Sequence, residues 1–515
     1  MSKKVFVIHP FLLAVYPVVF LFSYNISQIS FSAIFKPIAV ILGFSLASWF
    51  ILNIFLKDRQ KSGVIVSLFL ILFFSYGHFR TLGGGNWQIF WLPFLWISLF
   101  VLGFHATVRS RKSFHKVTMI LNMVSAVLVA FSAANIIIYQ FPKVSLPEQY
   151  TGIQGDSGQR QQTETYPDIY FIVLDAYGRQ DILQEIYDFD NSEFIDFLRD
   201  KGFYIAERAT SNYCQTYLSI GSCFNLMYLD EWVKQIARHD KGYEPARKLC
   251  DKGYIQEFLR KQGYTIVSFS PKPVEPKLQN TDVHLHHGVL INEFQNALRN
   301  TTPLPDIMVI KENDSLLDTY RNEILYMLNT PKEIQQLDRT PKFVYMHVKI
   351  PHPPFVFGPN GEPIKAEAIF NSHDGDRLIQ RGRLSKAQYR KHYRNQVIFI
   401  NSQIKKMVNK ILANSSQPPI IMLISDHGPR SEVVWKDPEK TNVRECMSIL
   451  SAYYLPNDGS KHLYPEISLV NIFRVILNQY FGQNLELLPD KNYSILPSYQ
   501  DNFYNVTEKV QKEPF

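Results

Sequence analysis

Five long apolar runs near the start of the sequence constrain the fold more than any other feature. Each run approaches the ~20 residues that a helix needs to cross the hydrocarbon layer of a membrane. Core helices of globular proteins are rarely apolar around their whole circumference, so five successive runs predict a membrane domain. The first run lacks a clean small-residue cleavage site, and we expect it to be retained rather than removed as a signal peptide. The expected spans are residues 6–24, 33–56, 63–79, 88–106 and 117–140.

Basic residues are concentrated in alternate loops between these runs. Lys3 and Lys4 precede the first run, and the loops at 57–61 and 109–116 contain most of the other Lys and Arg residues of this part. Such loops favour the cytoplasmic side, so we expect a cytoplasmic N-terminus and, after five crossings, a globular part outside the cytoplasm. The runs contain few polar groups, which indicates an anchor rather than a transporter.

The net charge of +8 belongs to the membrane part. The first 140 residues contain eleven Lys and Arg and one acidic residue, Asp58, which leaves the remainder with a charge of −2. A nucleic-acid-binding protein would need clustered basic charge on its globular part, so we expect no nucleic-acid partner.

The rest of the chain divides by composition into three segments. Residues 141–167 are rich in Gln, Gly, Ser and Thr and are typical of a polar linker, 168–495 form the expected catalytic domain, and 496–515 form a tail. Short apolar strands alternate with amphipathic helices in the large segment, which predicts an α/β sandwich with a mainly parallel sheet. The expected elements are strands Ile169–Leu174, Thr265–Phe269, Phe343–Val348 and Ile420–Ile424 and helices Ser192–Lys201 and Gln388–Leu412.

Residues with metal-binding side chains lie at or just beyond the ends of three of these strands. In open parallel sheets, ligands bind beyond the carboxyl ends of the strands. A single Asp there is usually a cap or turn residue, and a single His is usually an ordinary polar residue, so only the set predicts a metal site. The set is Asp175, His347, His352, Asp426 and His427.

The segment Ser211–Ser222 contains a candidate nucleophile. If a helix begins near Gln215, Thr216 lies in its first turn, where free N–H groups and the helix dipole attract an anion. A hydroxyl bound to a divalent metal there could attack phosphorus or sulfur. Thr216 could equally be only a helix cap, and Cys214 is a rival nucleophile.

The chain has four cysteines, all in the part expected outside the cytoplasm: Cys214, Cys223, Cys250 and Cys446. An even number in an oxidising compartment favours disulfide bonds over a catalytic thiol. Pairing Cys214 with Cys223 and Cys250 with Cys446 is one of three connectivities, and the sequence does not choose among them.

Four motifs resemble those of the alkaline phosphatase and sulfatase superfamily. They are IYFIVLDAYGR (169–179), SNYCQTYLSIGS (211–222), YMHVKIPHPPFVFGPNG (345–361) and ISDHGPR (424–430). Their order is most similar to the membrane-bound bacterial branch, which includes phosphoethanolamine transferases acting on lipid A and lipoteichoic acid synthases. Members of that branch have five spans and an outward catalytic domain, so the resemblance implies a multi-pass protein of the bacterial plasma membrane.

The resemblance also implies roles for individual residues. Thr216 would be the nucleophile that carries a covalent phosphoryl group, and His347 and His352 would hold the substrate or protonate the leaving group. One divalent metal is implied, with zinc favoured and manganese or calcium as alternatives. Its ligands would be Asp175, Thr216, Asp426 and His427, and candidate phosphate contacts are Tyr177, Arg179 and Arg430.

Two departures from the superfamily pattern narrow the chemistry. The sulfatase signature, Cys or Ser followed by x-Pro-x-Arg, is absent because Cys214 is followed by Gln215, Thr216 and Tyr217, which favours phosphate over sulfate. A complete second metal set is not evident. The cluster His284-Leu285-His286-His287 could supply ligands but is more typical of a polar loop.

The sequence thus predicts a metal-dependent transferase or hydrolase of phosphate (or sulfate) esters at the outer face of the membrane. Its partners would be a phospholipid donor and an envelope glycan or lipid. One alternative is an ester hydrolase of the same fold without a lipid acceptor, and another is a non-catalytic protein of envelope assembly.

Overall fold

The structure is a computed structural model in which part of the chain is described. The expected linker falls outside the described residues except for residues 166 and 167, and so does much of the expected tail. The described residues are 5–26, 31–81, 87–140, 166–230, 249–251, 253–269, 281–285, 293–307, 312–337, 341–364, 379, 382, 384–434, 440–495 and 503–511.

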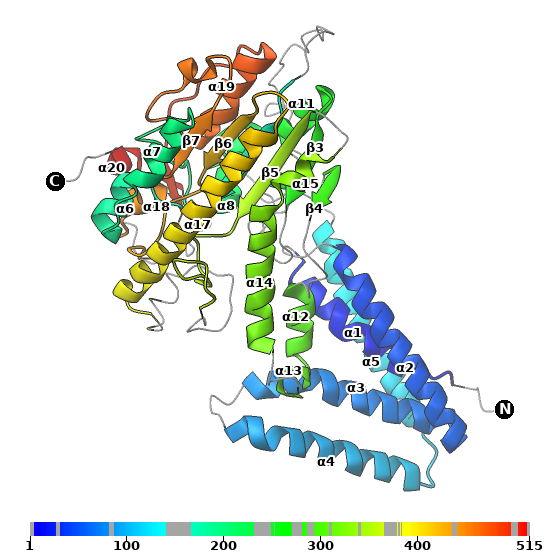
Figure 1. The fold of residues 1–515 in the computed structure, drawn as a ribbon. Coiled ribbons are helices and arrows are strands. Elements are labelled where there is room, and N and C mark those ends of the chain that lie inside the picture. The colour runs from blue at the N-terminus through cyan, green and yellow to red at the C-terminus, as the bar shows by residue number, and fades with distance from the viewer. Residues whose placement is uncertain are drawn as a thin grey trace. The chain divides into compact units, whose positions relative to one another are not determined.

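The chain divides into two compact units (Figure 1). The first comprises Met1–Val144 and Ile291–Glu312, and the second comprises Ser145–Leu290 and Asn313–Phe515. The first unit therefore includes a segment from far along the chain.

Among the described residues of the first unit, four helices are long and apolar enough to cross a membrane. The expectation of spanning helices is confirmed for these four, whereas the first apolar run forms a shorter helix of 16 residues. That helix ends where the Asn25 side chain donates to the carbonyl of Leu21 (2.8 Å), which satisfies one of its last acceptors. The helices are α1 (His9–Tyr24), α2 (Phe35–Leu56), α3 (Arg59–Thr81), α4 (Trp87–Arg109) and α5 (His115–Gln140), with the short η1 (Phe31–Ile34) before α2.

Two helices from the distant segment, α12 (Glu293–Asn300) and α13 (Leu304–Ile307), belong to this unit. The Phe294 ring is buried and packs edge-on against Phe22 of α1, with centroids 6.5 Å apart. The amide of Gly77 donates to the carbonyl of Thr301 (2.9 Å), and a Cβ at Gly77 would collide with the neighbouring backbone. The close approach of these two segments therefore requires glycine at position 77.

The second unit is built on a seven-stranded sheet in the order β2-β7-β6-β1-β5-β3-β4. The pairs β6-β1, β1-β5, β5-β3 and β3-β4 are parallel, and the edge pairs β2-β7 and β7-β6 are antiparallel, which confirms the mainly parallel sheet. The strands are β1 (Ile169–Leu174), β2 (Tyr204–Ile205), β3 (Thr265–Phe269), β4 (Val283–Leu285), β5 (Lys342–Val348), β6 (Ile420–Ile424) and β7 (Ser451–Tyr454).

Helices cover both faces of this sheet (Figure 1), because alternate side chains of its buried strands point to opposite sides. Tyr170 and Ile172 of β1 face one core cluster, and Ile169 and Phe171 face the other. On the first face lie α6 (Gln180–Tyr187), α7 (Ser192–Asp200), α14 (Glu312–Asn329), α15 (Pro331–Gln335) and α17 (Lys386–Asn414). On the second face lie α8 (Thr216–Asn225), α11 (Tyr254–Lys261) and α19 (Leu469–Phe481). The remaining elements are α18 (Val443–Met447), η3 (Gly459–His462), α20 (Thr507–Gln511) and the hairpin β8 (Tyr493–Ile495) and β9 (Phe503–Asn505).

Candidate metal centre

Three neighbouring parallel strands, β6, β1 and β5, carry the candidate metal ligands at their carboxyl ends. Asp175 directly follows β1, Asp426 and His427 follow β6, and His347 lies opposite Val173 near the end of β5. Parallel strands end at the same edge of a sheet, so these side chains converge although they lie far apart in the sequence.

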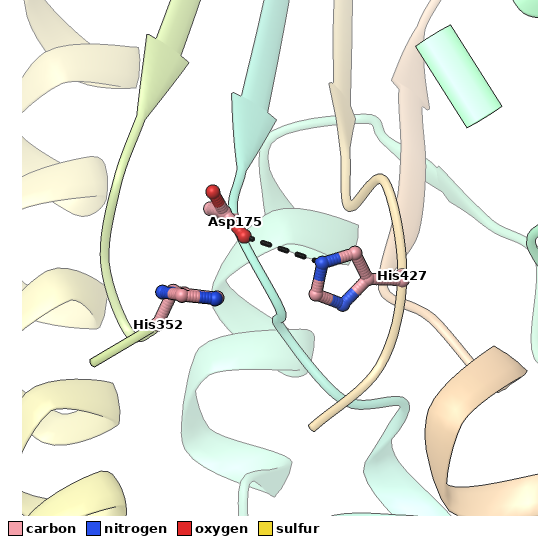
Figure 2. A group of neighbouring side chains, drawn as sticks. All are labelled: Asp175, His352 and His427. Carbon is pink, nitrogen blue, oxygen red and sulfur yellow. Dashed lines mark ion pairs between the residues drawn. The ribbon is translucent and has the colours of Figure 1, made fainter. Parts of the chain in front are cut away.

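The five side chains meet in a buried cluster. His347 Nε2 lies 3.3 Å from Asp175 Oδ2 and 4.0 Å from Asp426 Oδ2. His427 Nε2 lies 3.6 Å from a carboxylate oxygen of each of these aspartates. Two triads have ligand atoms within 4.8 Å of one another, Asp175 with His352 and His427 (Figure 2) and Asp175 with His347 and Asp426.

Backbone contacts fix the loops that carry these ligands. The turn after β1 places Ala176 in the left-handed region (φ 62°), and its amide donates to Asp426 Oδ1 (3.2 Å). The next amide, of Tyr177, donates to Ser425 Oγ (2.8 Å). The amide of His352 donates to the carbonyl of Asp175 (3.0 Å). The three loops therefore hold one another through direct hydrogen bonds.

The Nδ1 atoms of two of the histidines face backbone carbonyl oxygens. A carbonyl oxygen can only accept, so Nδ1 of His427 donates to Gly428 O (2.8 Å) and Nδ1 of His352 donates to Pro353 O (2.5 Å). Burial favours the neutral ring of His427 by lowering its pKa, which leaves its Nε2 lone pair for a metal, the usual arrangement of metal-binding histidines.

Buried polar atoms at the centre of the cluster fit a cation. Among the described residues, Asp175 Oδ1 and Asp426 Oδ2 are buried and make no hydrogen bond, while Asp175 Oδ2 lies 3.3 Å from His347 Nε2 and 3.4 Å from Lys349 Nζ. Such atoms are costly inside a protein unless a charge or donor offsets them. Carboxylate and imidazole ligands suit zinc or manganese, so the donor set fits one divalent metal.

The charges around Asp175 keep it ionised. Burial alone would raise the pKa of Asp175, but the charges of His352 and Lys349 hold this pKa well below its usual range. Burial, together with the charge of Arg430, lowers the pKa of His427. The site thus combines a carboxylate with a neutral imidazole, the forms that bind a metal.

Comparison with known proteins decides the family. The sulfatase family profile matches residues 167–473. The chain belongs to the sulfatase family. No curated protein matches the sequence.

Several solved structures are similar to this sulfatase-family chain at low sequence identity. The periplasmic domain of EcEptC from Escherichia coli, also solved in complex with Zn, is 11% identical, with 68% of this chain and 94% of that chain covered and a TM-score of 0.41. Lipooligosaccharide phosphoethanolamine transferase A from Neisseria meningitidis is 12% identical, with 92% and 95% covered and a TM-score of 0.39. The periplasmic domain of phosphoethanolamine transferase EptC from Campylobacter jejuni is 11% identical, with 63% and 92% covered and a TM-score of 0.39.

Lys349 lies beside the candidate metal ligands although the sequence analysis did not select it. Its Nζ lies 3.4 Å from Asp175 Oδ2, and only 13% of its side chain is exposed. The sequence feature that could have identified Lys349 is its position between His347 and His352, just beyond the carboxyl end of β5, where ligands of parallel sheets bind.

Thr216 is the first residue of α8 and is half-buried. The preceding Gln215 is extended, as an N-cap residue is expected to be, so Thr216 lies in the first turn. Arg430, three residues after His427, donates through Nη2 to the carbonyl of Cys214. This contact joins the Thr216 segment to the loop after β6, while the metal-binding role of Thr216 stays a prediction.

The other candidate phosphate contacts already have partners within the protein. Tyr177 is fully buried, donates to Asn401 Oδ1 (2.6 Å) and accepts from Asn191 (3.0 Å). Arg179 pairs with Asp181 (2.7 Å), and Arg430 contacts the carbonyl of Cys214. These contacts favour positioning roles, and direct contact of these residues with a substrate remains a prediction.

His284 lies apart from the candidate metal ligands because of the order of the strands in the sheet. It lies on the edge strand β4, which β3 and β5 separate from β1, and its Nδ1 is 3.1 Å from Ser268 Oγ. The other two histidines of that cluster, at 286 and 287, lie outside the described residues.

Proposed function

We propose that this sulfatase-family chain transfers or hydrolyses phosphate esters at the outer face of a membrane through a covalent intermediate on Thr216. The observation that carries the proposal is the convergence of Asp175, Asp426 and His427, because His427 Nε2 lies 3.6 Å from an oxygen of each of the two buried carboxylates. The favoured reaction is transfer from a phospholipid donor to an envelope glycan or lipid.

The metal-binding residues would be Asp175, Asp426, His427 and the Thr216 hydroxyl. A divalent cation, with zinc favoured by the ligand types, would promote ionisation of the hydroxyl and offset charge on the phosphate oxygens. Side chains and backbone amides of this chain would perform the nucleophilic attack, the binding of phosphate oxygens and the proton transfers.

Thr216 is suited to the attack by its place on α8. Free N–H groups of the first turn of a helix bind phosphate oxygens and stabilise charge that develops on them. In the first step a bond forms between the threonine oxygen and phosphorus, and the bond from phosphorus to the leaving oxygen breaks. In the second step an acceptor hydroxyl, or water, takes the phosphoryl group and restores Thr216.

His347 and His352 are the candidate proton donors to the leaving oxygen. Both lie in the cluster with Asp175 and are almost fully buried. Buried groups next to the reacting centre can transfer a proton without loss to solvent, and in the second step the same groups would accept the proton of the acceptor hydroxyl or water.

Phosphate is favoured over sulfate by the residues around the nucleophile. Cys214 is followed by Gln215, Thr216 and Tyr217, which departs from the signature of the sulfatase nucleophile. A threonine oxygen can form and break a phosphate ester in two displacement steps at phosphorus.

The outward orientation is supported by the basic loops of the first unit. Lys61 Nζ donates to the carbonyls of Ser110 (2.8 Å) and Val108 (3.2 Å), so the loops at 57–61 and 109–116 lie at the same end of that unit. If this end is cytoplasmic, α5 begins inside and the following chain continues outside, whether or not the short α1 crosses.

A phospholipid-transfer assay with mass analysis tests the proposal. We expect detergent-purified protein incubated with a fluorescent phospholipid and metal to gain the mass of the transferred group on Thr216. A labelled acceptor identifies a transferase, and release of headgroup alone identifies a hydrolase. Thr216→Ala should lose both the added mass and turnover, whereas Thr210→Ala, a threonine outside the proposed mechanism, should keep them. Full function of Thr216→Ala would instead favour a non-catalytic envelope protein.

A further inference from the structure

Two cysteine thiols lie in contact beside the segment that leads to Thr216. The side chains of Cys214 and Cys446 lie in one small buried cluster, and each alters the ionisation of the other, so that the pKa of Cys214 is lowered and the pKa of Cys446 is raised. Both are buried in a small apolar cluster whose other members include Val443, Met447 and Val506. The two thiols are thus enclosed together and shielded from solvent.

The backbone brings the segments of the two cysteines together. The amide of Ser211 donates to the carbonyl of Met447 (2.8 Å), and Thr210 and Ser448 form an antiparallel bridge. Cys214 follows Ser211 by three residues, and Cys446 directly precedes Met447. Hydrogen-bonded backbone therefore holds the two cysteine-bearing segments together.

The other two cysteines lie elsewhere. Cys250 donates through Sγ to the carbonyl of Tyr217 (3.3 Å), and Cys223 is fully buried in the core cluster on the α8 face of the sheet. Of the three possible connectivities, the one that joins Cys214 to Cys446 agrees with their shared cluster and also pairs Cys223 with Cys250, which share the other core cluster.

We infer that Cys214 and Cys446 form a disulfide bond that ties the Thr216 segment to α18, whose Cys446 carbonyl accepts from the Gly428 amide of the loop after β6. The inference rests on the outward orientation in the proposed function, because disulfides persist in oxidising compartments. Each thiol loses one proton and one electron as the S–S bond forms. The two electrons pass to a protein disulfide that acts as the oxidant by thiol–disulfide exchange and is itself reduced to a dithiol.

The bond would act on the geometry of the site. Arg430 already joins the Cys214 carbonyl to the loop after β6, and a covalent bond to α18 would add a second attachment of the same segment. The start of α8 and the loop that carries Asp426 and His427 would then move as one piece. Reduction would leave hydrogen bonds and packing alone to hold them.

Peptide mapping of the full chain tests the inference without any need for activity. The protein is acid-quenched in membranes, alkylated with N-ethylmaleimide in denaturant without reductant, digested and analysed by mass spectrometry. We expect a peptide that joins Cys214 to Cys446 and disappears after reduction. Unlinked, fully alkylated Cys214 and Cys446 that also fail to join in a glutathione disulfide buffer would overturn the inference, as would a Cys214–Cys223 link.

A second measurement separates this inference from the proposed orientation. Suppose that the thiols of Cys214 and Cys446 are free in the isolated protein but form a disulfide in glutathione disulfide. This result would support the pairing of the two cysteines and contradict the location of the second unit in an oxidising compartment. Cys446→Ala should expose Cys214 to alkylation and abolish the drop in melting temperature that a reductant causes in the wild type. The matched control Cys223→Ala should retain both the Cys214–Cys446 disulfide and the decrease in melting temperature on reduction. Equal sensitivity to reductant in Cys446→Ala and wild type would count against the bond.

Discussion

His427 Nε2 lies 3.6 Å from Asp175 Oδ1, across the adjacent ends of β6 and β1. The other ring nitrogen of His427 donates to Gly428 O, so in the neutral ring a lone pair faces the carboxylate (Figure 2). A lone pair and a carboxylate repel each other at this distance unless a cation lies between them. The same atoms are therefore expected to govern metal binding and much of the local stability.

Asp175→Asn should abolish most of the stabilisation that metal gives. A metal at about 100 times its dissociation constant stabilises a protein with one site by about 2.7 kcal/mol. We expect this gain in the metal-free wild type titrated with zinc, measured by chemical unfolding, and little gain in the variant. Asp190→Asn, the same change at an exposed carboxylate, is the control. A gain equal to that of the wild type would show that Asp175 is not a ligand.

Lys349→Met should increase the affinity for metal. The Lys349 ammonium, 3.4 Å from Asp175 Oδ2, competes with a divalent cation for that carboxylate and repels it once bound. We expect metal affinity to rise about tenfold, equivalent to about 1.4 kcal/mol, when titrated by calorimetry on chelator-stripped protein. Lys349→Arg keeps the charge and should bind metal with nearly wild-type affinity. Unchanged or weaker binding by the Met variant would contradict this competition.

Much of the sheet could be predicted from the sequence because its central strands are continuous apolar runs. The predicted bounds of β1, β3, β5 and β6 agree with the observed bounds to within one residue. The predicted first residues of α7 and α17 agree with the observed ones to within two residues. The edge strand β2 has two residues, Tyr204 and Ile205, too few for any periodicity to mark. The packing of α12 on the apolar helices depends on tertiary contacts such as Phe294 with Phe22, which no local pattern encodes.

The convergence of the candidate site residues could also be predicted, for a topological reason, whereas their metal binding stays a prediction. Strand ends of a parallel sheet are neighbours whatever their separation in sequence, so Asp175, His347 and Asp426 converge once the strands are recognised. Lys349 was missed because lysine is usually a solvated surface residue, and only the fold shows that this one is enclosed. Contact between Cys214 and Cys446 depends on the pairing of two loops, which lies beyond sequence periodicity.

The metal-free protein should become less stable as the pH falls below about 6.5, the pKa of an unperturbed histidine. Burial lowers the pKa of His427 in the folded state, whereas in the unfolded chain the residue titrates near pH 6.5. The unfolded state therefore binds more protons between the lowered pKa and about pH 6.5, so the contribution is complete above this window and is lost as the pH falls through it. One group changes the unfolding free energy by at most about 1.4 kcal/mol per pH unit. The free energy of unfolding, measured with denaturant between pH 5 and 8, should change less steeply with pH in His427→Asn than in the wild type. An identical dependence on pH would show that His427 is not the cause.

Glu445 holds the loop that follows His427, so Glu445→Gln should destabilise the second unit. Its Oε1 accepts from Tyr187 OH (2.6 Å) and from the amide and hydroxyl of Ser431 (2.9 and 2.6 Å), and its Oε2 accepts from the amide of Glu432 (2.8 Å). A glutamine NH₂ in either position would face at least one backbone N–H, leaving buried donors unsatisfied at a cost of about 1–3 kcal/mol each.

Tyr187→Phe provides the graded comparison for this carboxylate, because it removes one donor and leaves the acceptor intact. We expect a smaller loss for Tyr187→Phe, about 1 kcal/mol, and a larger loss for Glu445→Gln when both are unfolded in urea. Because the Ser431 amide lies in the same loop as His427, the Gln variant should also bind metal more weakly. A Gln variant as stable as Tyr187→Phe would mean that the loop accommodates the amide and that Glu445 does not fix the ligand.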